Sequence, residues 1–200
     1  MKNVSESLSD LAAGKALLRP SDAVARGHSR LYLAQLAQRG LLHRISRGLY
    51  ALPQRQASEF TSLAEVVSKH PQALVCLLSA LAFHGLTTQA PFEVWIAVDN
   101  KARAPRMPYP PLHVVRFSGP ALTEGVELHN IEGVPVKITS VPKTIADCFK
   151  YRNKIGLDVA MEALKEAWIA KRVSMDELWR HGQICRVQNV MRPYLEGLTA

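Results

Sequence analysis

Residues 18–52 read LRPSDAVARGHSRLYLAQLAQRGLLHRISRGLYAL, and this stretch decides the fold of the N-terminal part of the chain. Pro20 suits the first turn of a helix, because its missing N–H would have no intrahelical partner there. Asp22 complements the positive end of that helix. Gly27 can adopt the positive φ that a sharp turn needs. The stretch therefore predicts a short helix that begins near Pro20 and is followed by a turn at Gly27.

A second helix is expected directly after this turn. Ser29 can cap it by accepting a hydrogen bond from a free N–H group of the first turn. Leu33, Leu36 and Ala37 fall at i, i+3 and i+4 and form one apolar stripe. Gly40 is placed to end the helix just past its last turn. The other face carries many hydrogen-bonding groups and few charges, and consists of His28, Leu31, Tyr32, Gln35, Gln38 and Arg39.

A basic hairpin is expected after the second helix. Residues 41–45 and 49–52 are rich in strand formers, and residues 46–48 between them fit a short loop whose glycine takes the left-handed conformation. Arg44 and Arg47 lie in this hairpin, where they can meet a phosphate backbone. The order helix, turn, helix and hairpin predicts a winged helix-turn-helix, with the hairpin as the wing.

The segment ARGHSRLYLAQLAQRGLLHRISRGLYAL resembles the N-terminal domain of AbiEi-type antitoxins, the transcriptional regulators of abortive-infection toxin–antitoxin pairs. In that family a helix ending in RG is followed by LL.R…RGLYAL. The resemblance continues in SALAFHGL at residues 79–86 and in SVPKTIADC at residues 140–148. It implies a regulator that represses its own operon and counteracts a toxin, usually a nucleotidyltransferase-like protein, without a stable complex. The implied DNA partner is a double-stranded operator with inverted repeats.

The positive charge of the chain is concentrated in the same region. Of the net charge of +8, residues 11–58 contribute +7, because eight cations face one acid, Asp22. The cations are Lys15, Arg19, Arg26, Arg30, Arg39, Arg44, Arg47 and Arg55. A polyanion would dock on such a surface, and together with the helix-turn-helix pattern this distribution favours DNA binding.

The predicted DNA contacts all lie in the second helix and the wing. Tyr32 and Gln35 lie near the N-terminal half of the helix and are expected to reach base edges in the major groove. Arg44 and Arg47 are expected to contact phosphates. The complete set of predicted DNA-binding residues is Ser29, Arg30, Tyr32, Gln35, Arg39, Arg44 and Arg47.

A domain boundary is expected at residues 53–58, where a proline and polar residues end the last strand. We therefore predict a DNA-binding domain over residues 1–58, with its first helix over residues 5–18, and an α/β domain over residues 59–200. Strands of the second domain are expected over residues 92–98, 112–117, 126–131 and 134–139. Its helices are expected over residues 60–70, 79–84, 141–151, 157–170, 174–181 and 185–195. The fold class is α+β, a winged helix-turn-helix followed by a mixed α/β domain with a small sheet and C-terminal helices.

Composition indicates an ordinary globular protein. The 200 residues with 48% apolar content can bury a sizeable core. No apolar run of ~20 residues and no signal-peptide pattern is present, so a cytoplasmic location is expected. Cys76, Cys148 and Cys185 are widely spaced and outside any CxxC motif, so buried reduced thiols are expected rather than disulfides or a zinc site.

Two other functions compete with the antitoxin hypothesis. A stand-alone winged-helix regulator would use its second domain to bind a small ligand or to dimerise. A metal-dependent nuclease would need two acids that converge on Mg²⁺ beside a lysine, and Glu93, Asp99 and Lys101 offer such residue types. Six residues of extended strand would separate the two acids by about 20 Å, which is too far. No catalytic residue, metal ligand or cofactor is therefore predicted, and the chain is not expected to be an enzyme.

The loop over residues 101–111, KARAPRMPYPP, remains open in function. It holds three cations and one aromatic side chain among four prolines. Such a loop could be a second contact to nucleic acid, although a solvated connection between strands is the more common role of this composition.

Overall fold

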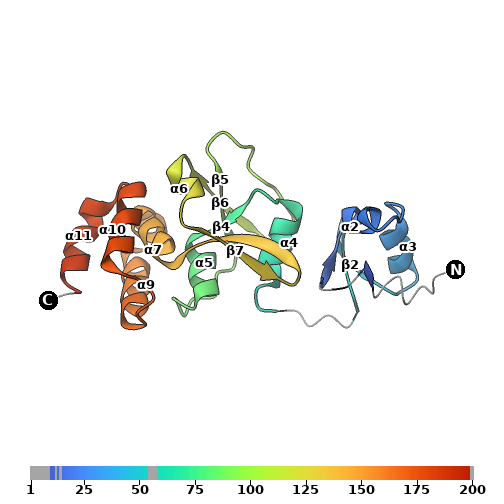
Figure 1. Ribbon diagram of the computed structural model, residues 1–200, viewed down its shortest axis with the longest axis horizontal. Coiled ribbons are helices and arrows are strands. Elements are labelled where there is room, and N and C mark those ends of the chain that lie inside the picture. Colours follow the sequence, from blue (N-terminus) through green and yellow to red (C-terminus); the bar gives the residue numbers. More distant parts are fainter. Residues whose placement is uncertain (1–9, 12, 14, 54–57, 199–200) are drawn as a thin grey trace. The chain divides into compact units, whose positions relative to one another are not determined.

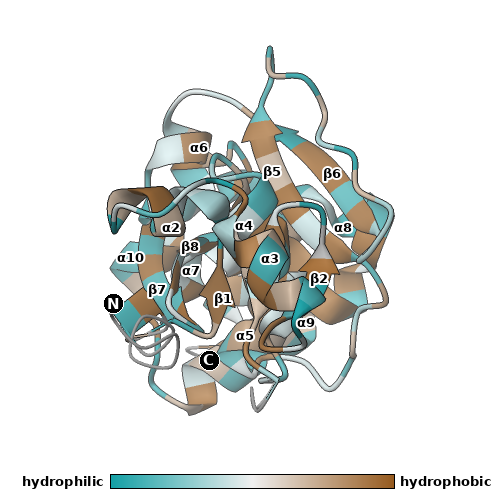
Figure 2. Ribbon diagram, turned by 90° about the vertical axis from the view of Figure 1, so that its right-hand side faces the viewer, coloured by the Kyte–Doolittle hydropathy of each residue, from teal (hydrophilic) through white to brown (hydrophobic). Residues whose placement is uncertain are grey.

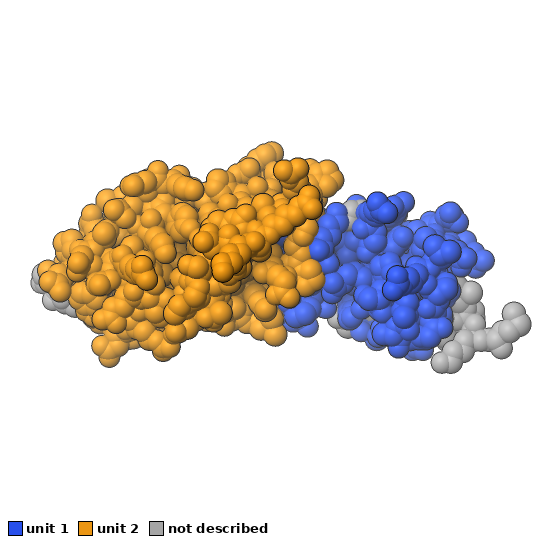
Figure 3. Space-filling model, turned by 90° about the horizontal axis from the view of Figure 1, so that it is seen from above, with its two compact units in different colours: residues 1–69, 130–135 blue, residues 70–129, 136–200 orange. Residues whose placement is uncertain are grey.

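The computed structural model describes residues 10–11, 13, 15–53 and 58–198 (Figure 1). The chain forms two compact units, which Figure 3 colours separately. Unit 1 comprises residues 1–69 and 130–135, and unit 2 comprises residues 70–129 and 136–200. The expected boundary falls largely on residues 54–57, which lie outside the described residues. The domain limits 1–58 and 59–200 therefore stay a prediction.

Unit 1 contains a three-stranded antiparallel sheet. Its strands are β1 (Leu17–Leu18), β2 (His43–Ser46) and β3 (Leu49–Ala51), in the order β1-β3-β2. The expectation that the first helix reaches residue 18 is wrong at its end, because residues 17–18 form β1 instead. Both leucines are buried where β1 pairs with β3, and this long-range pairing overrides the local helical spacing.

Two helices of unit 1 pack on a small core. They are α2 (Pro20–Ala25) and α3 (Tyr32–Gln38), and a third helix, α4 (Thr61–Lys69), follows later. Gly27 and Gly40, at the ends of α2 and α3, have φ of 82° and 74°, as the sequence predicts. The core consists of Leu11, Leu18, Ala23, Leu33, Leu36, Leu42 and Tyr50. Helices α2 and α3 followed by the β2–β3 hairpin, with β1 completing the sheet, make unit 1 a winged-helix type of fold.

Unit 2 is built around a five-stranded mixed sheet. The strands are β4 (Leu74–Val75), β5 (Val94–Asp99), β6 (Leu112–Phe117), β7 (Val126–Ile131) and β8 (Val134–Thr139). Their order is β6-β5-β4-β8-β7, in which β5 and β6 are parallel, β4 and β8 are parallel, and β4 and β5 are antiparallel. Glu132 and Gly133 join β7 to β8 with positive φ values of 53° and 80°. The four strands predicted for this region are confirmed.

Seven helices of unit 2 are described, and the longer ones follow the predicted pattern. They are α5 (Leu77–His84), α6 (Pro120–Thr123), α7 (Val141–Lys150), α8 (Arg152–Ile155), α9 (Leu157–Ile169), α10 (Met175–Ile184) and α11 (Gln188–Glu196). The four-residue helices α6 and α8 were not expected, because so short a helix leaves no clear periodicity. Every residue of α7 except Lys150 is buried, so α7 is the central helix of this unit. It packs against α5, α9 and α10 (Figure 1).

Candidate nucleic-acid interface

The exposed face of α3 carries the residues predicted to contact DNA. Leu33 and Leu36 turn inward and are at most 1% exposed, which fixes the rotation of the helix. Ser29, Arg30, Gln35 and Arg39 are exposed, whereas Tyr32 is half-buried. Seen from the side of unit 1, α3 shows hydrophilic bands between hydrophobic ones (Figure 2). The helix therefore has the two-sided character that a groove-reading helix needs.

Ser29 does not cap α3 with its side chain, so this expectation is wrong. The N-cap position is Leu31, and no side-chain cap hydrogen bond is present there. The Tyr32 N–H donates instead to the Ser29 carbonyl oxygen, at 3.1 Å. Residues 30–31 form a turn ahead of the helix, which places Ser29 too early to act as the cap. Its hydroxyl stays exposed on the surface of unit 1.

Tyr32 is held by a neighbouring aromatic ring. The His28 and Tyr32 rings are stacked, with centroids 4.2 Å apart and an interplanar angle of 6°. This stack fixes the direction of the Tyr32 side chain before any ligand arrives, and so lowers the entropy cost of ordering it on binding. Sequence reasoning placed both residues on the outer face but did not foresee their stacking.

The wing presents two arginines from different parts of one hairpin. Arg44 lies in β2 opposite Tyr50, and Arg47 lies in the two-residue loop that precedes β3. Gly48 completes this loop with φ of 74°, a conformation that glycine adopts without strain. Both arginines are exposed. A β-bulge or similar irregularity lies between Arg44 and Ser46 and changes the register of the two strands there.

Cations of unit 1 fall into two groups. Lys15 forms an ion pair of 2.6 Å with Asp22, and Arg19 donates to the Ser68 carbonyl oxygen at 3.0 Å, so these two cations support the fold. Burial raises the pKa of Asp22, but Lys15 and the Arg19 N–H outweigh it and lower the pKa overall. Lys69, the last residue of α4, is half-buried. The remaining described Lys and Arg side chains of unit 1 are exposed and have no ion pair with a described acid: Arg26, Arg30, Arg39, Arg44 and Arg47.

These five arginines form an uncompensated positive surface. An arginine that is covered by a binding partner needs a negative charge opposite its guanidinium group. The phosphates of a nucleic-acid backbone supply such charges at regular intervals. The arrangement of α3 and the wing beside these arginines can therefore hold a polyanion and place Gln35 against it. The seven predicted contact residues are brought together on unit 1, and their contact with DNA stays a prediction.

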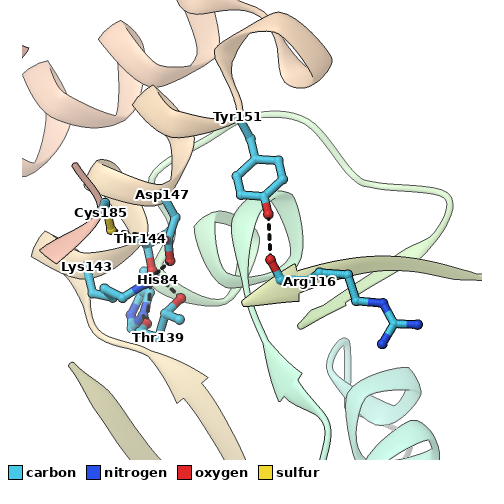
Figure 4. Close-up of polar contacts among 8 residues, drawn as sticks. All are labelled: His84, Arg116, Thr139, Lys143, Thr144, Asp147, Tyr151 and Cys185. Atoms are coloured by element: carbon cyan, nitrogen blue, oxygen red, sulfur yellow. Dashed lines mark hydrogen bonds and ion pairs between the residues drawn. The ribbon is translucent and has the colours of Figure 1, made fainter. Parts of the chain in front are cut away.

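A second polar cluster lies inside unit 2 and was not predicted (Figure 4). Lys143 and Asp147, one turn apart on α7, form an ion pair with side chains at most 1% exposed. The Lys143 ammonium also lies over the Phe117 ring, 4.6 Å from its centroid. The Cys185 thiol donates to the other Asp147 oxygen at 3.2 Å. The signal in the sequence was a Lys and an Asp four residues apart, at positions 143 and 147 of the segment SVPKTIADC. From the sequence alone, this segment was used only for its resemblance to the family.

This cluster stabilises the fold and lacks the features of a reactive site. Burial raises the pKa of Asp147, while Lys143 and the Cys185 thiol oppose the shift. Burial also raises the pKa of Cys185 to about 12, with Asp147 adding to the shift. Cys76 and Cys148 are likewise buried, with raised pKa values. All three cysteines are free and buried, as predicted, and stay protonated at neutral pH.

Two histidines of unit 2 are kept neutral. The His84 ring nitrogen Nε2 lies 2.7 Å from the Thr139 carbonyl oxygen, which can only accept, so Nε2 carries a proton and donates. Burial lowers the pKa of His84 although this hydrogen bond opposes the shift. Burial also lowers the pKa of His181, and Lys143 adds to this effect. Both side chains therefore act as uncharged packing groups.

The residues considered for a nuclease do not converge. Glu93 pairs with His113 at 3.1 Å, whereas Asp99, at the other end of β5, accepts a hydrogen bond of 2.8 Å from the Lys101 N–H. Within the described residues, no group of three or more His, Cys, Asp or Glu side chains is placed to hold a metal ion. The geometry at β5 thus gives the nuclease hypothesis no support.

None of the helices in the described part of the chain is long and apolar enough to cross a membrane.

With this geometry in view, unit 1 is a domain of the winged-helix type that carries exposed arginines beside α3 and in the wing. Residues 6–53 match the family described as transcriptional regulators, AbiEi antitoxin. The match lies within unit 1, and over these residues it confirms the resemblance seen in the sequence. The similar motifs at residues 79–86 and 140–148 lie outside it and stay a prediction.

One known crystal structure has a similar fold over most of the chain. The fold is similar to the crystal structure of the RV2827C protein from Mycobacterium tuberculosis, with a TM-score of 0.59 and 16% sequence identity. The similarity covers 89% of this chain and 70% of that chain. At this identity it shows the fold alone. No curated protein matches the sequence.

Proposed function

We propose that this protein is a DNA-binding autoregulator that acts as an antitoxin. In this proposal unit 1 binds a double-stranded operator with inverted repeats and represses the protein's own operon in the cytoplasm. The protein also counteracts a nucleotidyltransferase-like toxin without forming a stable complex with it. The observation that carries the proposal is the set of five exposed, unpaired arginines around α3 and the wing, in the segment that matches the AbiEi family.

The physical support for DNA binding is stronger than the support for toxin neutralisation. An exposed helix with an amide side chain at Gln35 can read base edges, and the wing arginines can contact the adjacent phosphates. Toxin neutralisation rests on the family likeness, because unit 2 offers a buried Lys143–Asp147 pair but no exposed catalytic constellation among its described residues. The family match lies in unit 1, so the assignment of the antitoxin role to unit 2 rests on the similar motifs at residues 79–86 and 140–148.

The test of DNA binding uses the full-length protein and a random pool of duplexes. Repeated selection should yield a preferred sequence with inverted repeats, and this sequence should occur upstream of the protein's own gene. Binding to the selected duplex should exceed binding to random DNA by about a thousandfold or more at physiological salt. A pool that yields no preferred sequence would contradict the proposal.

The test of the antitoxin role uses the neighbouring gene. If that gene encodes a nucleotidyltransferase-like protein, its expression alone should arrest growth, and co-expression with this protein should restore survival. Co-purification should yield no stable complex. If the protein represses its own operon but does not restore survival, the stand-alone regulator is favoured, whose second domain binds a ligand or dimerises.

A further inference from the structure

Leu31 is an apolar side chain on an otherwise polar surface. It is 68% exposed, which makes it the most exposed large apolar side chain among the described residues of unit 1. Its immediate neighbours are Arg30, which is exposed, and Tyr32, which is stacked on His28. An isolated exposed leucine is ordinary on a protein surface. Its position in line with Gln35 and Arg39 indicates a role in binding.

Leu31, Gln35 and Arg39 form one line along α3. The Gln35 N–H donates to the Leu31 carbonyl oxygen at 3.0 Å, and the Arg39 N–H donates to the Gln35 carbonyl oxygen at 3.2 Å. Residues four apart lie on the same side of a helix, so the three side chains follow one another at successive turns. All three are exposed, while Leu33 and Leu36 on the other side fill the core.

The three side chains offer three different chemistries in a row: an apolar group, an amide and a guanidinium. In the major groove an amide suits adenine and a guanidinium suits guanine, whereas an apolar side chain suits the C5-methyl group of thymine. The flanking arginines disfavour an apolar protein partner at Leu31, because covering this side chain would also desolvate their charges. Phosphates beside the groove would neutralise the same arginines.

We propose that Leu31 is a specificity-determining residue that reads the methyl group of a thymine in the preferred duplex. The proposal rests on the proposed function, since it assumes that α3 lies in the major groove. One helical turn rises ~5.4 Å and one base-pair step ~3.4 Å. The thymine read by Leu31 therefore lies one or two base pairs from the pair that Gln35 contacts, and within the reach of the same helix.

The experiment removes the methyl group without changing the base pairing. Each thymine of the selected duplex is replaced in turn by 2′-deoxyuridine, and the affinity of the full-length protein is measured by fluorescence anisotropy. At one position in each half-site, the loss of the methyl should weaken wild-type binding by about fourfold, the effect of one buried methyl group. The Leu31→Ala variant should bind the thymine and deoxyuridine duplexes equally at that position.

Two control variants separate this effect from general damage. Val24→Ala removes another exposed apolar side chain, 46% exposed, from α2 and should keep the fourfold thymine preference. Leu31→Met retains an apolar group at the same site and should also keep it. Circular dichroism should show unchanged folding for Leu31→Ala, because the wild-type side chain contributes little buried surface.

The outcomes distinguish this proposal from the proposed function. If wild type prefers the selected duplex over random DNA but tolerates every deoxyuridine, or if Leu31→Ala retains the thymine preference, the assignment of Leu31 is overturned while DNA reading stands. If wild type shows no preference for the selected duplex with all thymines present, the proposed function itself fails. If Leu31→Ala alters only the sedimentation coefficient, Leu31 covers a second copy of the chain, which also overturns the assignment.

Discussion

Arg47 and Lys143 show how differently the two units use a positive charge. Arg47 lies exposed in the wing of unit 1, without an ion pair to a described acid. Lys143 lies fully buried in unit 2, paired with Asp147 and placed over the Phe117 ring. An exposed charge costs little to maintain and is available to a ligand. A buried charge is tolerated only with its partner, so it specifies the fold and has no role at the surface.

This contrast teaches where function and stability should separate. Loss of an exposed arginine in unit 1 should weaken binding and leave folding intact. Loss of the partner of Lys143 in unit 2 should damage folding.

Asp147→Ala should destabilise unit 2 by about 3–5 kcal/mol, because it leaves the Lys143 ammonium buried without its counterion. Urea unfolding of the full-length protein measures the change. Glu124→Ala is the matched control, since it breaks an exposed ion pair with Arg180 and should cost less than about 1 kcal/mol. The double variant Lys143→Met with Asp147→Leu should recover much of the loss. Equal costs for Asp147→Ala and Glu124→Ala would remove the contrast between buried and exposed charge.

Gln35→Ala should relax sequence specificity by about 1–3 kcal/mol, because a bidentate amide contact to a base edge would be lost. The affinity for the selected duplex should fall more than the affinity for random DNA of the same length. Gln38→Ala changes another exposed amide of α3 and serves as the comparison. Equal losses on both DNAs would count against base reading by Gln35.

Arg44→Ala and Arg47→Ala should each weaken binding to all sequences. Each substitution should lower the slope of log affinity against log salt by about one unit, because one phosphate contact is lost. Arg180→Ala in unit 2 removes an exposed charge of the same kind and should leave the slope unchanged. A wing variant that keeps the wild-type slope would show that its arginine points away from the phosphates.

Acidification should produce the smallest effect, and it should act on unit 2. Burial lowers the pKa of His84 and of His181 from the ordinary value of 6.5. Below that pH the unfolded chain binds more protons than the folded chain. The contribution of the two histidines to the free energy of unfolding is therefore complete above about pH 6.5 and is lost as the pH falls below it. Melting temperatures measured across this range should fall less steeply in a His84→Gln, His181→Gln double variant. His43→Gln, at an exposed histidine of unit 1, should leave the steepness unchanged.

Local patterns made unit 1 readable from the sequence. The Pro20 ring restricts its own φ, and Gly27, Gly40 and Gly48 permit the positive φ that each turn requires, so the helices and the wing loop could be placed from sequence alone. The error at Ser29 has a different cause. Two exposed turn residues, Arg30 and Leu31, separate it from the first residue of α3, and the start of a helix within such a turn depends on packing that the sequence does not display.

Long-range contacts account for most of what was missed. Strand β1 exists because Leu17 and Leu18 find β3, some thirty residues later in the chain. The buried Lys143 cluster joins α7 to Cys185 near the end of α10 and to Phe117 of β6. A lysine in a helix ordinarily indicates a solvated face, and only the surrounding fold shows that this one is enclosed. The residues of the candidate interface could be chosen from the sequence. The His28–Tyr32 stack and the bulge in the wing could not be predicted from it.

We expect unit 1 to supply the electrostatic part of DNA binding. The most direct measurement compares the salt dependence of binding of two full-length variants, each with four exposed cations changed to glutamine. The unit 1 variant changes Arg30, Arg39, Arg44 and Arg47, and the unit 2 variant changes Lys101, Arg103, Arg106 and Lys165. The unit 1 variant should lose about three to four units of slope, and the unit 2 variant should keep the wild-type slope. An equal loss in the unit 2 variant would place a DNA contact on unit 2 as well and contradict this expectation.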